Sequence, residues 1–149
     1  MMAQTLEPQT ATTDVVRFET SPPGLDGLHE FSIQPLDPDG LLFSMTARPH
    51  AGSDWADGDA PRLFLVQPGP YFADYSPRIP SETLAALGDD DGATTPEDLA
   101  ILVVLNPGVS PAATTANLLA PVLLNTRTRR ARQIVLDDGS WPLRAPLHA

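Results

Sequence analysis

The segment TANLLAPVLLNTRTRRARQIVLDDGSWPLRAPL, residues 115–147, says more about the fold than any other part of the chain. It reads as an apolar strand, an arginine-rich turn, a second apolar strand, an acidic turn and a tail that begins with Trp141. Two short apolar runs on either side of a polar turn are typical of a β-hairpin. The segment therefore predicts antiparallel β structure near the C-terminal end of the sequence.

The same alternation of apolar runs and turns continues upstream. Seventeen prolines and ten glycines leave little room for long helices, because proline breaks helix interiors and lies at turns and edges in sheets. Between the turn-forming clusters lie seven short runs rich in Val, Leu, Ile and Phe. These expected strands cover residues 15–18, 30–36, 41–47, 62–66, 99–105, 120–126 and 132–136. The run 99–105 is apolar at every position, which indicates a central strand covered on both faces.

Short helices are expected at two or three places. Ser81 is a candidate N-cap for a helix over 82–87, with Gly88 as its C-terminal stop. Thr95 followed by Pro96 is a second helix-start signature, and Ser110 can open a third short turn. We therefore predict a mainly β fold: a compact, antiparallel, β-barrel-like single domain with two or three short helices. Residues 14–149 form this domain, and residues 1–13 are expected to be a flexible N-terminal arm.

Composition excludes several classes of protein. The chain has 149 residues, enough for one self-sufficient core, and no cysteine, so disulfides and thiolate chemistry are absent. No apolar run is long enough to span a bilayer, and the first residues do not resemble a secretory signal. The net charge is −10, which repels nucleic acid and anionic lipid and attracts basic partners. The alternative interpretation is that acidity only keeps the chain soluble.

Signs of catalysis or metal binding are weak. The three histidines, His29, His50 and His148, lie in unrelated segments without a partner at metal-ligand spacing. Neither a Gly-x-Ser-x-Gly elbow nor a phosphate-binding loop occurs. The consecutive acids at 89–91 do not follow the alternating pattern of a calcium loop, so a solvated turn is expected there.

One alternative from a different class remains open. The chain could be a small β-barrel enzyme, or a protein that binds a metabolite or metal, with a pocket lined by His50 and by the loop that carries Asp54, Asp57 and Asp59. A deep polar cavity would favour this alternative, and a filled core would favour an interaction protein.

Two surface features are candidates for contacts with other molecules. Arg127, Arg129, Arg130 and Arg132 form a basic cluster on the predicted hairpin, where we expect them to pair with surrounding acids; an RNA contact is the alternative. The motif PGPYFADYSP brings three aromatic residues together between prolines. These are Tyr71, Phe72 and Tyr75, which either pack in the core or anchor a partner.

Several motifs in order along the chain resemble FliW, the bacterial flagellar assembly factor. PPGLDGLHEF is similar to the N-terminal segment of that family, RLFLVQPGPYFADYSPRIPSETLAALG to its strand, aromatic turn and short helix, and TPEDLAILVVLNPG to its next helix start and central strand. The most specific part is TANLLAPVLLNTRTRRARQIVLDD, in which the matching positions are Thr115, Asn117, Leu118, Ala120, Pro121, Asn125 and Gln133. The chain departs from the pattern in a longer Gly/Asp-rich loop around 54–59, at Leu28, where an aromatic residue is common, and at Trp141, where tyrosine is frequent.

The resemblance implies a cytoplasmic binding protein that is not an enzyme and needs no cofactor or metal. It implies two partners, flagellin and the RNA-binding translational regulator CsrA. FliW released from flagellin binds CsrA allosterically and relieves repression of flagellin translation, so that translation is coupled to export. On this basis the expected partner-binding residues are Tyr71, Phe72, Asp74, Tyr75, Asn117 and Leu118. Asn117 has a structural alternative, as a hydrogen-bonding cap of the turn before the strand.

Overall fold

The computed structural model describes residues 15–22, 25, 27–38, 40–48, 60–90, 92–106, 113–136 and 141–147. Four of the sequence predictions lie outside these residues. They are the arm over 1–13, the loop with Asp54, Asp57 and Asp59 together with His50, the turn at Ser110, and His148.

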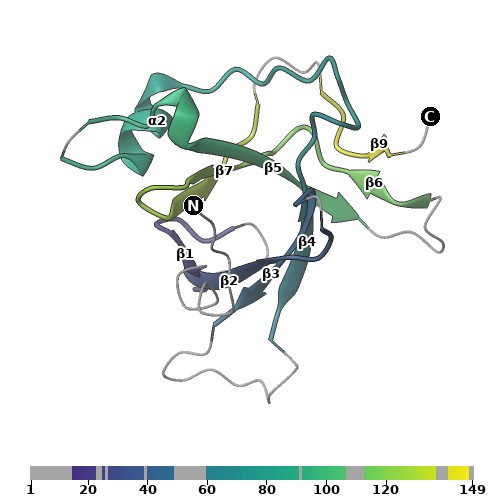
Figure 1. Cartoon of the computed structure of the whole chain (residues 1–149), viewed down its shortest axis with the longest axis horizontal. Coiled ribbons are helices and arrows are strands. Elements are labelled where there is room, and N and C mark those ends of the chain that lie inside the picture. Colours follow the sequence, from purple (N-terminus) through teal and green to yellow (C-terminus); the bar gives the residue numbers. More distant parts are fainter. Residues whose placement is uncertain are drawn as a thin grey trace.

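Seven strands of the described chain close into a barrel (Figure 1). They are β1 (Val15–Phe18), β2 (Glu30–Pro35), β3 (Leu42–Ala47), β4 (Arg62–Val66), β5 (Leu99–Asn106), β7 (Val122–Asn125) and β8 (Arg130–Gln133). Their order is β4-β3-β2-β1-β8-β7-β5, and a further pairing of β4 with β5 completes the ring. All of these pairs are antiparallel except β1 with β8, which is parallel. The predicted β-barrel is confirmed, and the parallel pair is the one departure from the expected antiparallel arrangement.

Two further strands form an outer extension of β5. β6 (Thr115–Ala116) pairs with β5, and β9 (Ala145–Pro146) pairs with β6. Figure 1 shows them beside the end of β5, outside the ring. They were not predicted, because strands of two residues have no periodicity that a sequence pattern can reveal.

The interior of the barrel is filled by apolar side chains from alternate strand positions. On β2, Phe31 and Ile33 are buried while Pro35 at the end of the strand is exposed. The rings of Phe18 and Phe31 meet edge to face at 5.4 Å. Burial of each large apolar side chain contributes roughly 1.5–3 kcal/mol, so this core supplies most of the stability of the barrel.

Strand β5 is covered on both faces, as predicted. Leu102 belongs to the cluster inside the barrel, whereas its neighbour Val103 belongs to a second cluster outside the ring. The outer cluster includes Ala116 of β6 and Ala145 of β9, together with Leu118. Because successive side chains of a strand point to opposite faces, one strand contributes to two cores.

The described residues contain one α-helix, α2 (Ser81–Leu87), and one 3-10 helix, η2 (Pro96–Asp98). The second expected start is confirmed as a 3-10 helix, with Thr95 as its N-cap and Pro96 as its first residue, so one α-helix is seen there where two or three short helices were expected. Ser81 is the first helical residue and not the N-cap, because Pro80 occupies that position and accepts the bond from the Thr83 amide. Gly88 ends the helix as predicted. Neither helix is long and apolar enough to cross a membrane.

The last barrel strand starts two residues earlier and ends three residues earlier than predicted. The expected strand was 132–136, whereas β8 is Arg130–Gln133. Parallel pairing of Arg130 and Ala131 with β1 extends the ladder toward the hairpin. Beyond the strand, the amides of Ile134 and Leu136 bond to the carbonyl groups of Pro121 and Leu119, and the Val135 side chain between them is 65% exposed.

Candidate functional site

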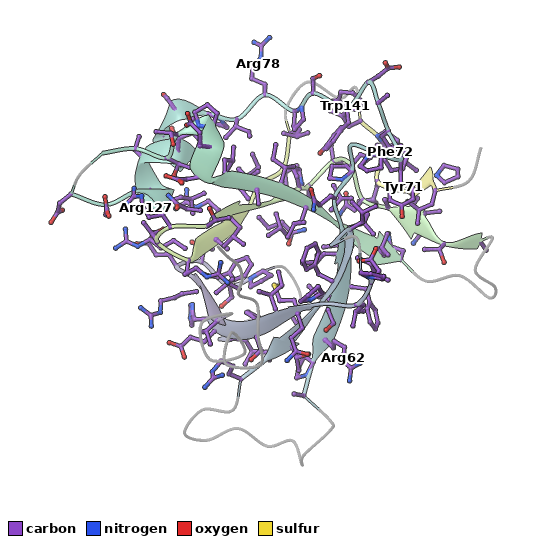
Figure 2. The ribbon with its side chains drawn as sticks, in the orientation of Figure 1. Arg62, Tyr71, Phe72, Arg78, Arg127 and Trp141 are labelled. Carbon is purple, nitrogen blue, oxygen red and sulfur yellow. The ribbon has the colours of Figure 1, made fainter. Side chains whose placement is uncertain are left out.

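The predicted aromatic turn is a compact, hydrogen-bonded loop between β4 and α2. The amides of Tyr71 and Phe72 donate to the Pro68 carbonyl oxygen at 3.0 and 2.8 Å, and the Tyr75 amide donates to the Phe72 carbonyl oxygen at 2.9 Å. Figure 2 shows Tyr71, Phe72 and Trp141 gathered on the side of the molecule where β6 and β9 lie. Backbone bonding of this kind fixes the directions of the side chains.

The members of the turn face in two directions. Tyr71 is 42% exposed and Asp74 is also exposed. By contrast, Phe72 and Tyr75 pack against the outer cluster. The Tyr75 ring meets the Trp141 ring edge to face at 4.8 Å, and its hydroxyl donates to the Leu118 carbonyl oxygen at 2.7 Å. Tyr75 therefore attaches the turn to the β6–β9 layer, and Tyr71 and Asp74 are the side chains presented to solvent.

Asn117 and Leu118 have structural contacts. The Asn117 side-chain oxygen accepts hydrogen bonds from the amides of Leu119 and Ala120, both at 3.1 Å, so the capping alternative describes its geometry. The Leu118 side chain is 3% exposed and lies inside the outer cluster, so it has almost no surface to offer a partner. A role in partner binding for these two residues and for the aromatic turn stays a prediction.

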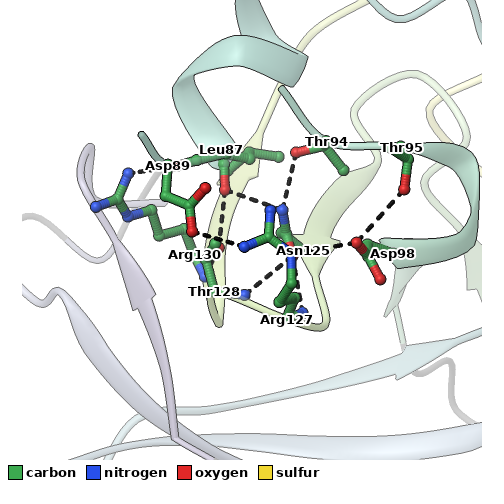
Figure 3. A network of polar contacts seen from close by, with 10 residues as sticks. Leu87, Asp89, Thr94, Thr95, Asp98, Asn125, Arg127, Thr128 and Arg130 are labelled. Carbon is green, nitrogen blue, oxygen red and sulfur yellow. Dashed lines mark hydrogen bonds and ion pairs between the residues drawn. The ribbon is translucent and has the colours of Figure 1, made fainter. Parts of the chain in front are cut away.

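A second polar network, which sequence reasoning did not identify as a unit, is built around a buried amide (Figure 3). Asn125 is fully buried, and its nitrogen donates to the Leu87 carbonyl oxygen at 3.1 Å and to the Thr94 hydroxyl at 3.0 Å. Its oxygen accepts from the amides of Arg127 and Thr128 at 2.8 and 3.0 Å. All the hydrogen-bonding capacity of the amide is used, so the β7–β8 turn is fixed to the end of α2.

The arginines of that turn pair with acids, as predicted, at two positions. Arg127 lies between Asp89 at 2.6 Å and Asp98 at 3.3 Å, and Arg132 lies 3.6 Å from Glu19. The hydrogen bonds that Arg127 donates to Asp89 and then to Asp98 raise the pKa of its guanidinium. Arg130 donates instead to the Gly88 carbonyl oxygen at 2.6 Å.

The described residues contain no group of three or more His, Asp and Glu side chains that could hold a metal ion. One ring nitrogen of His29 lies 2.8 Å from the Phe18 carbonyl oxygen, so this histidine has a structural contact with the neighbouring strand. The loop proposed for a metal or metabolite pocket, with Asp54 and His50, lies outside the described residues.

Comparison with known proteins identifies the family. The family model described as "FliW protein" matches residues 3–147. The chain belongs to the FliW family. The landmarks that carried the resemblance now have structural explanations in this FliW-family protein: Asn117 caps a turn, Asn125 fixes a hairpin, and Gln133 donates to the Ala120 carbonyl oxygen at 2.9 Å.

Similar proteins named "Flagellar assembly factor FliW" support this assignment. The protein of Thermotoga sp. (strain RQ2) is 31% identical over 142 residues, covering 93% of this chain and 85% of the relative. The Syntrophus aciditrophicus protein is 31% identical over 104 residues, or 70% of this chain and 63% of the relative. The Symbiobacterium thermophilum protein is 40% identical over 83 residues, or 56% and 57%. The match to each of the last two spans less than two thirds of the relative.

The fold agrees with a solved structure of the family. The crystal structure described as "the flagellar assembly factor FliW" superposes with a TM-score of 0.74 at 25% identity, covering 92% of this chain and 87% of the other. Two of the three departures from the family pattern lie in packed positions, and the third, the loop around 54–59, lies outside the described residues. Leu28 is 9% exposed in the barrel core, and the Trp141 ring packs against Tyr75.

Proposed function

We propose that this protein is a cytoplasmic flagellar assembly factor that acts by binding other proteins and catalyses no reaction. Its partners are flagellin and a CsrA-type RNA-binding regulator. Binding of the regulator relieves repression of flagellin translation, and binding of flagellin competes with it, so translation follows export. The observation that carries this proposal is the match of the FliW family model to residues 3–147.

The charge of the chain suits this role. A regulator that holds RNA is basic where the phosphates lie. A partner with a net charge of −10 lowers the positive potential available to RNA when it docks nearby, without filling the RNA groove itself. The same field speeds the encounter of the two proteins, while apolar contacts supply much of the affinity.

The aromatic turn is the surface that we assign to partner contact. Tyr71 is exposed on a loop whose backbone is hydrogen-bonded, and Phe72 and Tyr75 anchor that loop from behind. Tyrosine is enriched at interface hot spots because it offers a large contact area with few rotatable bonds. A fixed Tyr71 with Asp74 beside it can therefore contact a partner with little loss of conformational entropy.

Isothermal titration of the purified protein with flagellin and with the CsrA-type regulator of the same organism tests the proposal. Heat of binding is expected with both, and heat with neither would contradict it. Tyr71→Ala is expected to weaken binding of at least one partner by about tenfold or more, as hot-spot truncations do. Val135→Ala, which shortens an exposed apolar side chain that is not part of the aromatic turn, is the matched control and should bind as the wild type does.

A further inference from the structure

Two adjacent surface hollows lie where the end of α2 meets the parallel pair β1 and β8. One has a volume of about 390 Å³ and the other about 360 Å³. They share the lining residues Arg17 and Arg130, so they lie side by side, and we describe them together as one groove. The arginine groove, as we call it, is lined by Arg17, Arg127, Arg129, Arg130 and Arg132.

The local charge of this groove is opposite to that of the whole chain. Five arginines line it, together with two acids, Glu19 and Asp89. Glu30 and Asp98 pair with Arg17 and Arg127, so these side chains together leave 5 − 4 = +1. The chain as a whole carries −10 and has nine basic residues in total. Five of the nine basic side chains thus lie on one face, which makes a region that attracts anions on a chain whose overall field repels them.

The arginines at the rim are held by carboxylates that a ligand can replace. The Arg132–Glu19 pair is 3.6 Å long and the Glu19 side chain is 79% exposed. Arg17 pairs with Glu30 at 3.0 Å, and these side chains are 69% and 46% exposed. Ion pairs this exposed contribute little to stability, so an incoming carboxylate exchanges with them at small cost. Arg130 donates to the Gly88 carbonyl oxygen, an acceptor without formal charge, so this bond does not neutralise the positive charge of the side chain.

The groove is also preorganised. Its floor contains Phe18, Leu87 and Ala131, which are at most 2% exposed. The Leu87 carbonyl oxygen accepts from the Asn125 amide at 3.1 Å and from the Thr128 hydroxyl at 2.8 Å, which fixes the wall formed by α2 against the β7–β8 turn (Figure 3). A fixed wall and floor reduce the entropic cost of binding.

We propose that the arginine groove binds an extended acidic segment of a partner polypeptide, with side-chain carboxylates on Arg17, Arg130 and Arg132. The planar guanidinium fork matches a carboxylate bidentately, and two hollows side by side suit a chain longer than one small anion. This site does not depend on the partners named above. Figure 2 shows Arg127, on the rim of the groove, on the opposite side of the molecule from Tyr71, Phe72 and Trp141.

A polypeptide suits the groove better than RNA. Sequence-tolerant RNA binding needs aromatic faces on which bases stack. Of the rings at the groove, Phe18 is fully buried and His29 is bonded to the Phe18 carbonyl oxygen. A long polyanion also meets the whole −10 field, whereas a short acidic segment interacts mainly with charges within a Debye length of about 10 Å.

Fluorescence anisotropy with a labelled hexaglutamate peptide tests the proposal, at about 50 mM salt where exposed charges are weakly screened. The wild type should bind hexaglutamate and not hexaglutamine. The double variant Arg17→Gln/Arg132→Gln should bind at least about tenfold more weakly, because two charge-assisted contacts are lost. The matched control is Arg78→Gln, which removes the same charge from an exposed side chain that points away from the barrel in Figure 2.

Glu19→Gln provides a second test, in which tighter binding of hexaglutamate is expected instead of weaker binding. Removing this carboxylate from the rim should tighten hexaglutamate binding by about twofold to fivefold, which a purely structural role of the pair would not produce. If the double variant unfolds at a lower temperature than the wild type, Arg17→Gln alone replaces it in the binding test, because the Arg17 side chain is 69% exposed and contributes little to the core. Absence of hexaglutamate binding by the wild type, or equal binding by the Arg17 variants, would overturn the proposal. Tighter binding of a decauridylate RNA, lost in the same variants, would overturn it in favour of a phosphate site.

Discussion

The buried side-chain amide of Asn125 uses both of its N–H donors and its oxygen acceptor in hydrogen bonds. Asn125→Asp keeps the shape but removes the two N–H donors that reach the Leu87 carbonyl oxygen and the Thr94 hydroxyl. The new carboxylate would face that carbonyl oxygen in a fully buried position, so we expect a loss of about 3 kcal/mol in the free energy of unfolding. Urea denaturation followed by circular dichroism measures it. Asn106→Asp, at an exposed end of β5, should change the same quantity by less than about 0.5 kcal/mol.

Tyr75 and Tyr71 have different roles in the aromatic turn, and the same substitution at the two positions distinguishes them. Tyr75→Phe removes the hydroxyl that donates to the Leu118 carbonyl oxygen and leaves the edge-to-face contact with Trp141 intact. We expect a loss of about 1–2 kcal/mol in unfolding free energy, because a partly buried carbonyl group loses its donor. Tyr71→Phe makes the same chemical change on a ring that is 42% exposed and should be nearly neutral. Equal effects of the two substitutions on the urea midpoint would show that the Tyr75 hydroxyl bond adds no stability.

Single residues show where sequence reasoning reaches its limit. Asn117 could be proposed as a turn cap from sequence because its acceptor bonds reach only two and three residues along the chain. The acceptor bonds of Asn125 are equally local, but its donor bond to the Leu87 carbonyl oxygen could not be predicted, because Leu87 lies 38 residues away. The burial of Leu118 was also unpredictable, since it depends on the outer cluster with β6 and β9.

At the scale of elements, α2 ends at Gly88, where there is no room for a side chain, and the backbone conformation of this glycine is one that other residues can adopt. A Cβ atom at Gly88 would overlap the Gly92 carbonyl oxygen and lie 2.9 Å from the Ala93 Cα atom. Gly88→Ala should therefore cost about 1–3 kcal/mol through overpacking, measured as a lower urea midpoint. Gly69→Ala is the control, because a Cβ atom there meets nothing within 4 Å. A stable Gly88→Ala variant would mean that the turn after α2 adjusts freely.

The strands whose partners follow closely in the chain were predicted best. β1 and β4 have the predicted bounds, and β2 and β3 differ from them by one residue at one end. β8 was misplaced because its parallel partner β1 lies at the other end of the sequence, and no local pattern reports a pairing over that separation. The apolar run after β8 resembles a strand by composition, but Ile134 and Leu136 bond to the irregular segment before β7.

At the scale of the whole molecule, ring closure keeps two different surfaces apart. Closure of β1 on β8 leaves no free sheet edge in the ring and creates the arginine groove beside that seam. The outer layer of β6 and β9 supports the aromatic turn on the other side, as Figure 2 shows for Tyr71 and Trp141. A small barrel can therefore offer a basic and an aromatic surface to different partners at once.

The net charge of −10 leads to a prediction about salt. Affinity for the basic CsrA-type regulator should fall by about tenfold or more between 50 mM and 500 mM salt, because the Debye length shrinks from about 10 Å at 0.1 M to about 3 Å at 1 M. Most of the loss should lie in the association rate, since long-range attraction acts before contact. Surface plasmon resonance across this salt range measures both rates, with sucrose of matched osmolality as the control. An affinity unchanged by salt would mean that opposite charge does not bring the two proteins together and that apolar contacts alone account for the complex.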